Sequence, residues 1–517
     1  MIYISGMRTT WGVVAWGAVA WSTLAAPPKV LVSNLNGTPT RFVPGAPGIP
    51  FAPGIGVDST FSRVVCSPDG SRWSLQGWAS VSAGVEAEVV CSGSGTTGAG
   101  GFLVARVGNP SFFDAARTYT DLDMSVGVNN AGQVAFAGGV SGATTNNAFA
   151  ARFTPPTGYV LIAREGGQAV GQPAGIGYGA INDGVCMTES GAVILRSAVL
   201  TGAQTQHVVY SLSSLTSGAV IAQTDVHSPS GQLALPAQTL DFLANQRLAA
   251  SADGSFVAWA GDLNGNMATD AVITAGGTVV AQEGFALPGL TAPVHAVCPS
   301  MFSLCVAPRG GSWAAVGSNI DGGDWVLIDG SVAARTDAPV ASGLDDRFDD
   351  TLRTATFLGV AVNSSGSFLI AGMTDGPANA NEVVVLNGRR VVLREGDPID
   401  IDGNGVADDN AFAGSIRESG IALGDNGRVF AVISVRNPSG GEVGSAIVTF
   451  VAGCNSIDFN GDGLFPDNAD IEDFFSVFGG GPCSTGACDT IDFNNDDLLP
   501  DQTDLEDFLR VFSGGPC

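Results

Sequence analysis

The stretch NNAGQVAFA, residues 129–137, is the clearest copy of a unit that decides how this chain folds. It combines a polar turn, a glycine and an apolar run rich in strand formers, which is typical of two antiparallel strands joined by a tight turn. Copies recur about every sixty residues, with their glycines at Gly70, Gly132, Gly191, Gly254, Gly311, Gly366 and Gly427. So regular a repeat indicates seven equivalent structural units.

A second pattern repeats with the same period. Segments such as LVARVG, LIAREG and VVLREG place a polar residue at the end of an apolar strand, at Arg106, Arg164, Gln223, Gln282, Arg335 and Arg394. About sixty residues accommodate four strands with their loops, which is one propeller blade. The sequence therefore predicts an all-β fold, a seven-bladed β-propeller over residues 27–451, whose ends are joined by strands near residues 30–32 and 446–451. A chain of β-sandwiches or a linear solenoid is the competing architecture, but no polar capping repeat stands out.

The composition excludes several classes of function. Only 14% of the 517 residues are charged, and the formal net charge is −27. Nothing resembles the basic stripe that binds nucleic acid or an anionic membrane surface. Lys29 is the only lysine, which excludes P-loop and Schiff-base chemistry within the fold. The excess of carboxylates suits the binding of hard cations.

Residues 1–26 have the pattern of a secretory signal peptide. Arg8 precedes an apolar run, and small residues follow up to Ala26. The run is short for a membrane anchor, which is the competing interpretation. We therefore expect a secreted protein, extracellular or on the cell surface, in which disulfides can form.

The nine cysteines suggest a disulfide framework. Four lie near the carboxyl end, in two pairs that bracket segments of equal length. Symmetry predicts two disulfides there, Cys454–Cys483 and Cys488–Cys517. Two further candidate pairs are Cys66–Cys91 and Cys298–Cys305. Cys186 is then left over, and we expect it to be a buried free thiol.

Residues 452–517 form a module of two copies, in which Cys454 matches Cys488 and Phe478 matches Phe512. The module holds 14 acidic residues and one basic residue, and carboxylates at this density repel one another unless something neutralises them. DFNGDG at residues 458–463 has oxygen ligands at positions 1, 3 and 5 of a loop and glycine at position 6, as in an EF-hand. An amphipathic helix with acids at its start follows each loop. The predicted Ca²⁺ ligands are Asp458, Asn460, Asp462, Leu464 and Asp470 in the first copy and Asp492, Asn494, Asp496, Leu498 and Asp504 in the second.

Some details of the module depart from an ordinary calcium loop. Each loop is one residue too long and contains a proline, and Asp497 replaces the glycine of the second copy, so we expect a weaker second site. A solvated acidic tail is the alternative interpretation. Such tails lack the aromatic and cysteine periodicity seen here.

A further loop within the propeller region has the same spacing of oxygen ligands. DIDGNGVADD, residues 400–409, offers Asp400, Asp402, Asn404 and Asp408 at positions 1, 3, 5 and 9, and glycine at position 6. We interpret it as a calcium site. The aspartates at positions 345, 346, 349 and 350 lack such spacing, and we interpret them as a solvated turn.

Two resemblances to known families rest on these motifs. The unit N-x-x-G-x-x-A-F at residues 129–136 resembles the repeat of a family of secreted bacterial proteins common in planctomycetes, over roughly residues 30–450. This resemblance implies a propeller-like fold and no established activity. The tandem module resembles a dockerin, in the planctomycete form that begins C-x-x-x-D-F-N and ends G-G-P-C. Dockerins bind cohesins, so the resemblance implies a protein partner or an attachment role.

Catalytic motifs are sparse. The chain has three histidines and no H-E-x-x-H or G-x-S-x-G. Glu165, Glu283 and Glu395 recur at equivalent positions, which favours a structural turn over one asymmetric catalytic site. The sequence favours a non-catalytic calcium-binding scaffold whose partner is a cohesin-like protein, a cell-surface component or an extracellular glycan. An extracellular glycoside hydrolase or lyase with a dockerin-like appendage is the alternative.

Overall fold

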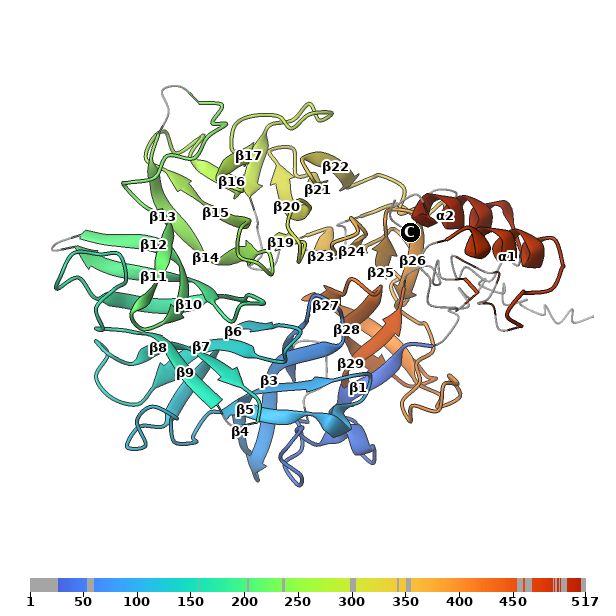
Figure 1. Ribbon diagram of the computed structural model, residues 1–517, viewed down its shortest axis with the longest axis horizontal. Helices are drawn as coiled ribbons and strands as arrows, with labels where there is room; N and C mark the ends of the chain where they lie inside the picture. Colours follow the sequence, from blue (N-terminus) through green and yellow to red (C-terminus); the bar gives the residue numbers. More distant parts are fainter. Residues whose placement is uncertain are drawn as a thin grey trace, which may run out of the picture.

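The protein is a seven-bladed β-propeller with two α-helices beside it (Figure 1), so the predicted fold class is confirmed. The computed structural model describes residues 27–517 except for 54–59, 157, 202–203, 235–237, 298–303, 342–343, 350–354, 453–458, 461–466, 487, 489–490, 492, 494–499 and 513–517. Each blade is an antiparallel sheet, and one strand of each sheet lines the central channel.

The first six blades are built from consecutive strands. Blade 1 has β2 (Phe61–Cys66), β3 (Arg72–Ser82), β4 (Val85–Ser94) and β5 (Phe102–Arg106). Blade 2 has β6 (Tyr119–Val128), β7 (Val134–Val140), β8 (Ala148–Thr154) and β9 (Gly158–Arg164). Blade 3 has β10 (Tyr178–Met187), β11 (Val193–Thr201), β12 (Gln204–Ser214) and β13 (Ser217–Gln223).

The next three blades follow the same order. Blade 4 has β14 (Leu240–Ala250), β15 (Val257–Leu263), β16 (Ala271–Ala275) and β17 (Thr278–Gln282). Blade 5 has β18 (Val294–Val297), β19 (Leu304–Val306), β20 (Trp313–Asn319), β21 (Asp324–Ile328) and β22 (Ser331–Arg335), and both β18 and β19 pair with β20. Blade 6 has β23 (Phe357–Val362), β24 (Phe368–Met373), β25 (Glu382–Leu386) and β26 (Arg390–Arg394).

Blade 7 joins the two ends of the propeller. Its three inner strands are β27 (Phe412–Leu423), β28 (Arg428–Arg436) and β29 (Glu442–Val451). The outermost strand is β1 (Lys29–Ser33), which pairs antiparallel with β29, as expected from the sequence. Figure 1 shows β1, in blue, beside the orange β29.

Asn34 secures this junction directly after β1. Its side chain is 5% exposed and donates to the carbonyl of Ala52 at 3.0 Å and to the Thr60 hydroxyl at 2.6 Å. Its Oδ1 accepts the N–H of Ser445 at 2.8 Å. One amide group therefore connects β1, blade 1 and β29.

The apolar core is divided among the blade interfaces. Seven clusters of buried side chains each combine residues of two neighbouring blades, and one of them packs blade 7 against blade 1. Trp73 and Trp325 are 0% exposed in two of these clusters. Burial of such rings removes them from any sugar-stacking role and contributes about 25 cal/mol per Å² of apolar surface.

The turns between the first and second strands form a closed ring of hydrogen bonds. Each turn is linked to the turn of the next blade, and the last is linked to the first. The seven links run from Asp69 N to Asn130 Oδ1, Asn130 N to Glu189 Oε1, Glu189 N to Ala252 O, Ala252 N to Pro308 O, Arg309 N to Ser364 Oγ, Ser364 N to Asp425 Oδ1 and Asp425 N to Pro68 O, at 2.6 to 3.1 Å.

The regularly spaced repeat glycines lie in these turns. In the fifth copy, however, the equivalent glycine is Gly310, whose N–H donates to the carbonyl of Ala307, and not Gly311 as the sequence pattern suggested. Both glycines have φ between 71° and 80°, a conformation that favours glycine. The GG pair left the register of this copy ambiguous in the sequence.

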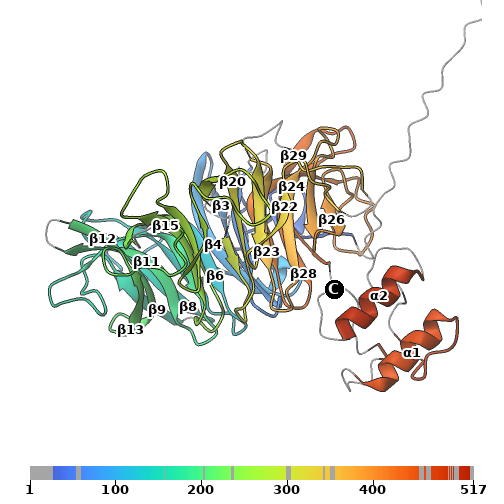
Figure 2. The same cartoon turned by 90° about the horizontal axis from the view of Figure 1, so that it is seen from above.

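The C-terminal module contains the two α-helices, α1 (Asn468–Phe478) and α2 (Gln502–Phe512), which occupy equivalent positions of its two copies, as the duplication predicts. Figure 2 shows them beside the propeller, on the side of β26. Neither helix has the length and apolar character that a membrane span needs, and the same holds for every described helix. Two short 3₁₀ helices, Pro39–Arg41 and Gly98–Gly100, lie in loops of the propeller.

Replacing Asn34 tests the closure of the ring. We expect Asn34→Ala to lower the free energy of unfolding by at least about 2 kcal/mol, because it leaves buried backbone and hydroxyl groups without a partner. Urea unfolding followed by tryptophan fluorescence measures this. Asn36→Ala, two residues away and exposed, is the matched control and should change stability by less than about 0.5 kcal/mol. Equal stability of the two variants would contradict this role for Asn34.

Candidate functional site

The loop between β26 and β27 brings three carboxylates together. Oxygens of Asp400, Asp402 and Asp409 all lie within 4.8 Å of one another. Asp400 is 1% exposed, and its two oxygens accept hydrogen bonds from the backbone N–H groups of residues 403–405 at 2.6 to 3.2 Å. The loop thus wraps around one buried carboxylate.

The third carboxylate of this cluster is not the one that the sequence pattern selected. Asp408 is exposed and is not part of the cluster. Asp409 takes its place, and its Oδ2 accepts the N–H groups of residues 401 and 402 at 2.6 and 3.2 Å. Asn404 lies in the loop, where its Oδ1 accepts the N–H of Val406. The loop turns back one residue later than a standard EF-hand spacing requires.

The same loop is bonded to the start of the propeller. The Val30 N–H donates to the carbonyl of Asp400 at 2.9 Å, and the Asp400 N–H donates to the carbonyl of Pro28 at 3.0 Å. The Lys29 ammonium donates to the carbonyl of Gly403 at 3.2 Å. Any ligand that orders this loop therefore also orders the strand that closes the ring.

In the first half of the C-terminal module, the structure brings together Asn460 and Asp470. They are 3% and 0% exposed, and the Asn460 N–H donates to Oδ1 of Asp470 at 3.3 Å. The other oxygen of Asp470 accepts the N–H of Asp467 at 3.0 Å, and the Asp467 carboxylate caps α1 in return. Asp470 therefore lies where the predicted loop meets the helix.

The second half repeats this arrangement. Asp504 is 0% exposed, and its Oδ2 accepts the N–H of Asp501 at 3.0 Å, while Asp501 caps the N–H of Asp504 at 3.2 Å. The remaining predicted ligands of the module lie outside the described residues, namely Asp458, Asp462, Leu464, Asp492, Asn494, Asp496 and Leu498. The predicted signal peptide, residues 1–26, also lies outside them.

One aromatic core joins the two halves of the module. Four phenylalanines are 0% exposed, two from each repeat: Phe459, Phe474, Phe493 and Phe508. The rings of Phe474 and Phe508 stack at 3.9 Å between centroids. Phe475 and Leu509, which occupy equivalent positions of the two copies, stay 46% and 41% exposed. The duplication thus has a shared interior and a repeated apolar position on its surface.

The symmetric disulfides predicted for the module are wrong. Cys483 is bonded to Cys488, while Cys454 and Cys517 lie outside the described residues. Between the bonded cysteines the chain turns at Gly486, with φ of 75°, and its N–H donates to the carbonyl of Cys483. The disulfide therefore joins the end of the first repeat to the start of the second. The symmetry argument had placed each disulfide within one repeat.

The three recurring glutamates have a structural role. Glu165, Glu283 and Glu395 each accept a backbone N–H at the start of the third strand of their own blade, at residues 147–148, 271 and 381. Thr224 accepts a backbone N–H of β12 in blade 3, and Thr336 accepts one of β21 in blade 5. Burial raises the pKa of Glu395, and Arg436 pairs with it at 2.6 Å and opposes that rise.

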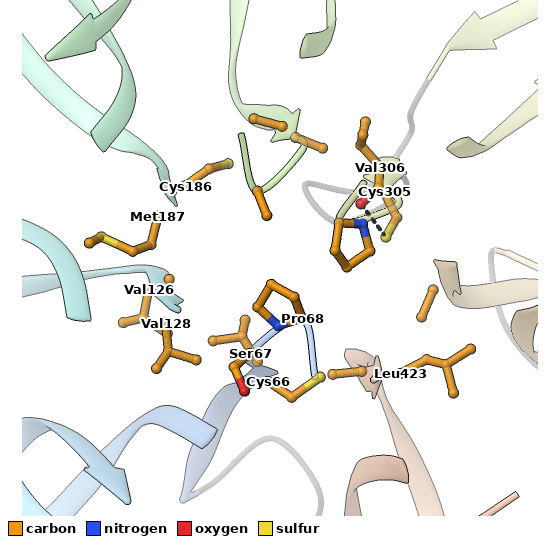
Figure 3. A pocket seen from close by; sticks show the side chains of 18 of the residues that line it. Cys66, Ser67, Pro68, Val126, Val128, Cys186, Met187, Cys305, Val306 and Leu423 are labelled. Atoms are coloured by element: carbon orange, nitrogen blue, oxygen red, sulfur yellow. Dashed lines mark hydrogen bonds between the residues drawn. The ribbon is translucent and has the colours of Figure 1, made fainter. Parts of the chain in front are cut away.

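The central channel is a cavity of about 200 Å³ lined by one inner strand of every blade. Figure 3 shows side chains from several blades around it, with the thiols of Cys66, Cys186 and Cys305 among them. These three cysteines and Cys91 are free, so the candidate pairs Cys66–Cys91 and Cys298–Cys305 are wrong, and Cys186 is free as expected. Burial raises the pKa of Cys66 to about 12 and that of Cys186 to about 11. Protonated thiols are poor nucleophiles, so neither of these two cysteines is activated.

Sequence reasoning missed a second cavity of about 500 Å³ at the edge of blade 5. Asp349, which the sequence suggested was part of a solvated turn, lines it together with Asp321, Asp324 and Asp337. Asp321 and Asp324 lie in the β20–β21 turn and at the start of β21, whereas Asp337 and Asp349 follow β22. No local spacing in the sequence signals that they meet.

Comparison with known proteins gives only distant structural similarities. No family model matches the chain, and no curated protein is similar to it. Among solved structures, it is similar to a puromycin hydrolase (12% identity, TM-score 0.40, 75% of this chain and 53% of that chain) and to prolyl oligopeptidase B from Galerina marginata (10%, 0.33, 73% and 47%). It is also similar to a polysaccharide lyase (9%, 0.40, 82% and 97%). The chain spans about half the length of the first two, and similarities this weak carry no functional argument.

The connection that precedes the loop at residues 400–409 contains a carboxyl that titrates in an accessible range. Asp397 is 8% exposed, and burial raises its pKa from 3.8 to about 6. The folded chain therefore binds a proton in this window that the unfolded chain has released. The free energy of unfolding of the unaltered chain, minus that of Asp397→Asn, should be highest below pH 4. This difference should fall by about 3 kcal/mol as the pH rises through 6. Urea unfolding of both proteins between pH 3.5 and 8 tests this, and a difference independent of pH contradicts it.

Proposed function

We propose that this chain is a secreted, non-catalytic calcium-binding protein in which the propeller is a binding scaffold and the C-terminal module attaches it to a partner. The observation that carries the proposal is the pair of fully buried carboxylates, Asp470 and Asp504, at equivalent positions of the duplicated module. Each lies in the first turn of a helix that follows an acidic loop.

Buried carboxylates require compensation. The helix N-terminus and the capping N–H groups supply part of it. The module as a whole, however, has 14 acidic residues against one basic residue, Arg510. Each carboxylate oxygen also has more than one acceptor site, and the hydrogen bonds to Asp470 given above fill one site on each. A hard cation with six to eight oxygen ligands, as Ca²⁺ takes, would satisfy both the charge and these sites.

The loop at residues 400–409 supports a further calcium site within the propeller. Its donors are all oxygens, and Asp400, Asp402 and Asp409 already lie close enough for one ion. Because the loop is bonded to residues 28–30, calcium there would stabilise the closed ring.

Attachment to a partner is supported by the surface of the two helices. Phe475 and Leu509 repeat the same exposed apolar position, and acidic residues at the surface, Glu472 and Glu506, repeat beside them. Contiguous exposed apolar patches mark protein interaction sites, and we assign these two positions to one such patch. Among a cohesin-like protein, a cell-surface component and an extracellular glycan, this favours a protein partner.

The channel lining does not favour the glycan-active alternative. A glycosidase site combines a pair of carboxylates with aromatic platforms. Among the described residues that line the channel, none is a carboxylate or an aromatic ring.

Replacing the two buried carboxylates tests the module. In the full chain, 1 mM calcium should raise the melting temperature relative to chelator, by an amount equivalent to about 2.7 kcal/mol if calcium is at 100 times its Kd. We expect Asp470→Asn with Asp504→Asn to remove most of the calcium heat assigned to the module in calorimetry. Glu472→Gln with Glu506→Gln, on the same helices, is the control with the same change in charge. Equal calcium binding by both double variants would refute the proposed module site.

A second comparison tests the loop of the propeller. Asp409→Asn should abolish the calcium-dependent part of propeller stability, because Asp409 belongs to the cluster of carboxylates. Asp408→Asn, its exposed neighbour, should leave it unchanged. Thermal unfolding of both variants with calcium and with chelator decides this. Loss of the calcium effect in Asp408→Asn alone would restore the ligand set that the sequence spacing suggested.

A further inference from the structure

A buried arginine of blade 3 departs from the pattern of the other blades. Arg196 lies in β11 between Leu195 and Ser197, and β10 bulges between the positions that pair with these two neighbours. The innermost strands of blades 2, 4 and 7 bulge at the same level, but the residue opposite the bulge is small or apolar there and buried, namely Ala137, Ala260 and Val432. The bulge itself therefore does not require an arginine.

The guanidinium of Arg196 has no hydrogen-bond or ion-pair partner among the described residues, although the residue is only 5% exposed. Arginines are almost never buried to this degree unless they are paired. Burial lowers the pKa of Arg196 from 12.5 to about 10, because it removes the charge from water. Its Nε is enclosed, but the two terminal nitrogens are not, so a ligand can reach them. An anion at this position would supply the missing partner.

Two rings lie beside this guanidinium, where β14 of blade 4 packs against blade 3 (Figure 1). Arg196 lies over the ring of Phe242, with 5.8 Å between Cζ and the ring centroid. This contact uses the face of the guanidinium and not the N–H donors at its edge. Phe242 in turn meets the ring of His207 edge-on at 4.9 Å between centroids. Because Phe242 is 38% exposed, the interface between the two blades opens to solvent at this ring.

His207, in β12, adds a hydrogen-bond donor without adding charge. Its Nδ1 accepts the N–H of Leu243 at 3.4 Å, which leaves the proton of the neutral ring on Nε2. Burial and the charge of Arg196 lower the pKa of His207 to about 4, so the ring is neutral near pH 7. Arg196 is then the one positive charge among these three side chains. One positive charge matches a carboxylate, a monoanion, better than a phosphate with two charges.

We propose that Arg196, His207 and Phe242 form a binding site for a small aromatic carboxylate. The carboxylate pairs with the terminal nitrogens of Arg196 and accepts the Nε2–H of His207, and the ring of the ligand packs against the exposed part of Phe242. This gives the propeller a ligand of its own. The site is distinct from the calcium sites proposed above and does not depend on them.

Titration of the full chain with benzoate, followed by saturation-transfer NMR, tests the proposal. Calcium is held at about 1 mM, so that the state of hard-cation sites does not vary between samples. We expect saturable binding of benzoate, weaker binding of acetate, which has no ring, and no binding of neutral benzamide at the same concentration. Arg196→Met should weaken benzoate at least about tenfold, which is about 1.4 kcal/mol. Arg196→Lys keeps the charge but loses the planar fork, so it should weaken benzoate by a smaller factor.

The stability of the ligand-free chain separates a binding role of Arg196 from a structural one. Methionine keeps much of the volume of arginine and removes an unpaired buried charge. Arg196→Met should therefore raise the melting temperature by at least about 1 °C in thermal unfolding. If the guanidinium instead held the two blades together, this variant would unfold at a lower temperature than the unaltered chain.

The control variant is Arg335→Met, which replaces an exposed arginine of blade 5 with the same loss of charge. It should bind benzoate as the unaltered chain does. Four results would overturn the proposal. These are no saturable binding of benzoate, an equal loss in Arg335→Met and Arg196→Met, tighter binding of phenyl phosphate than of benzoate, or a lower melting temperature of Arg196→Met.

Discussion

Closure of the ring depends on the antiparallel pairing of β1 with β29, which brings together residues such as Asn34 and Ser445, 411 positions apart in the chain. Every blade buries its apolar faces only against its two neighbours, so an open ring would expose two such faces. The outermost strand of blade 7 comes from the opposite end of the chain, and this makes the seven interfaces mutually dependent. Loss of one amide at the junction therefore acts on the whole propeller.

The ring of turn hydrogen bonds shows how repeats that share few residues can still form equivalent links between neighbouring blades. Where the second residue of a turn has an acceptor side chain, as at Glu189 and Ser364, that side chain receives the bond from the preceding blade. Where it is alanine or proline, the backbone carbonyl accepts instead. Proline has no N–H, so the following residue, Asp69 or Arg309, donates in its place. The links survive because the backbone can replace each missing side-chain function.

The acidic features of the protein lie on loops that this rigid ring positions. Carboxylates of the loop at residues 400–409 are held near one another by backbone hydrogen bonds and by the fold. Such a cluster carries unfavourable electrostatic energy, which a bound cation would lower.

The amino-acid sequence by itself determined the number of blades, the joining of the two ends and the positions of the two helices. Turn glycines and alternating strands follow from local backbone preferences, so they repeat visibly in the sequence. It also selected Asp400, Asp470 and Asp504 as candidate ligands through the spacing of calcium loops, a local property, and the structure buries all three. Only the tertiary structure decided the rest. It selected Asp409 over Asp408, bonded Cys483 to Cys488, and assembled Asn319 and Asp349 in one cavity. Each of these depends on how a turn is directed or on which distant loops meet, and packing between repeats, not spacing within one, sets those contacts.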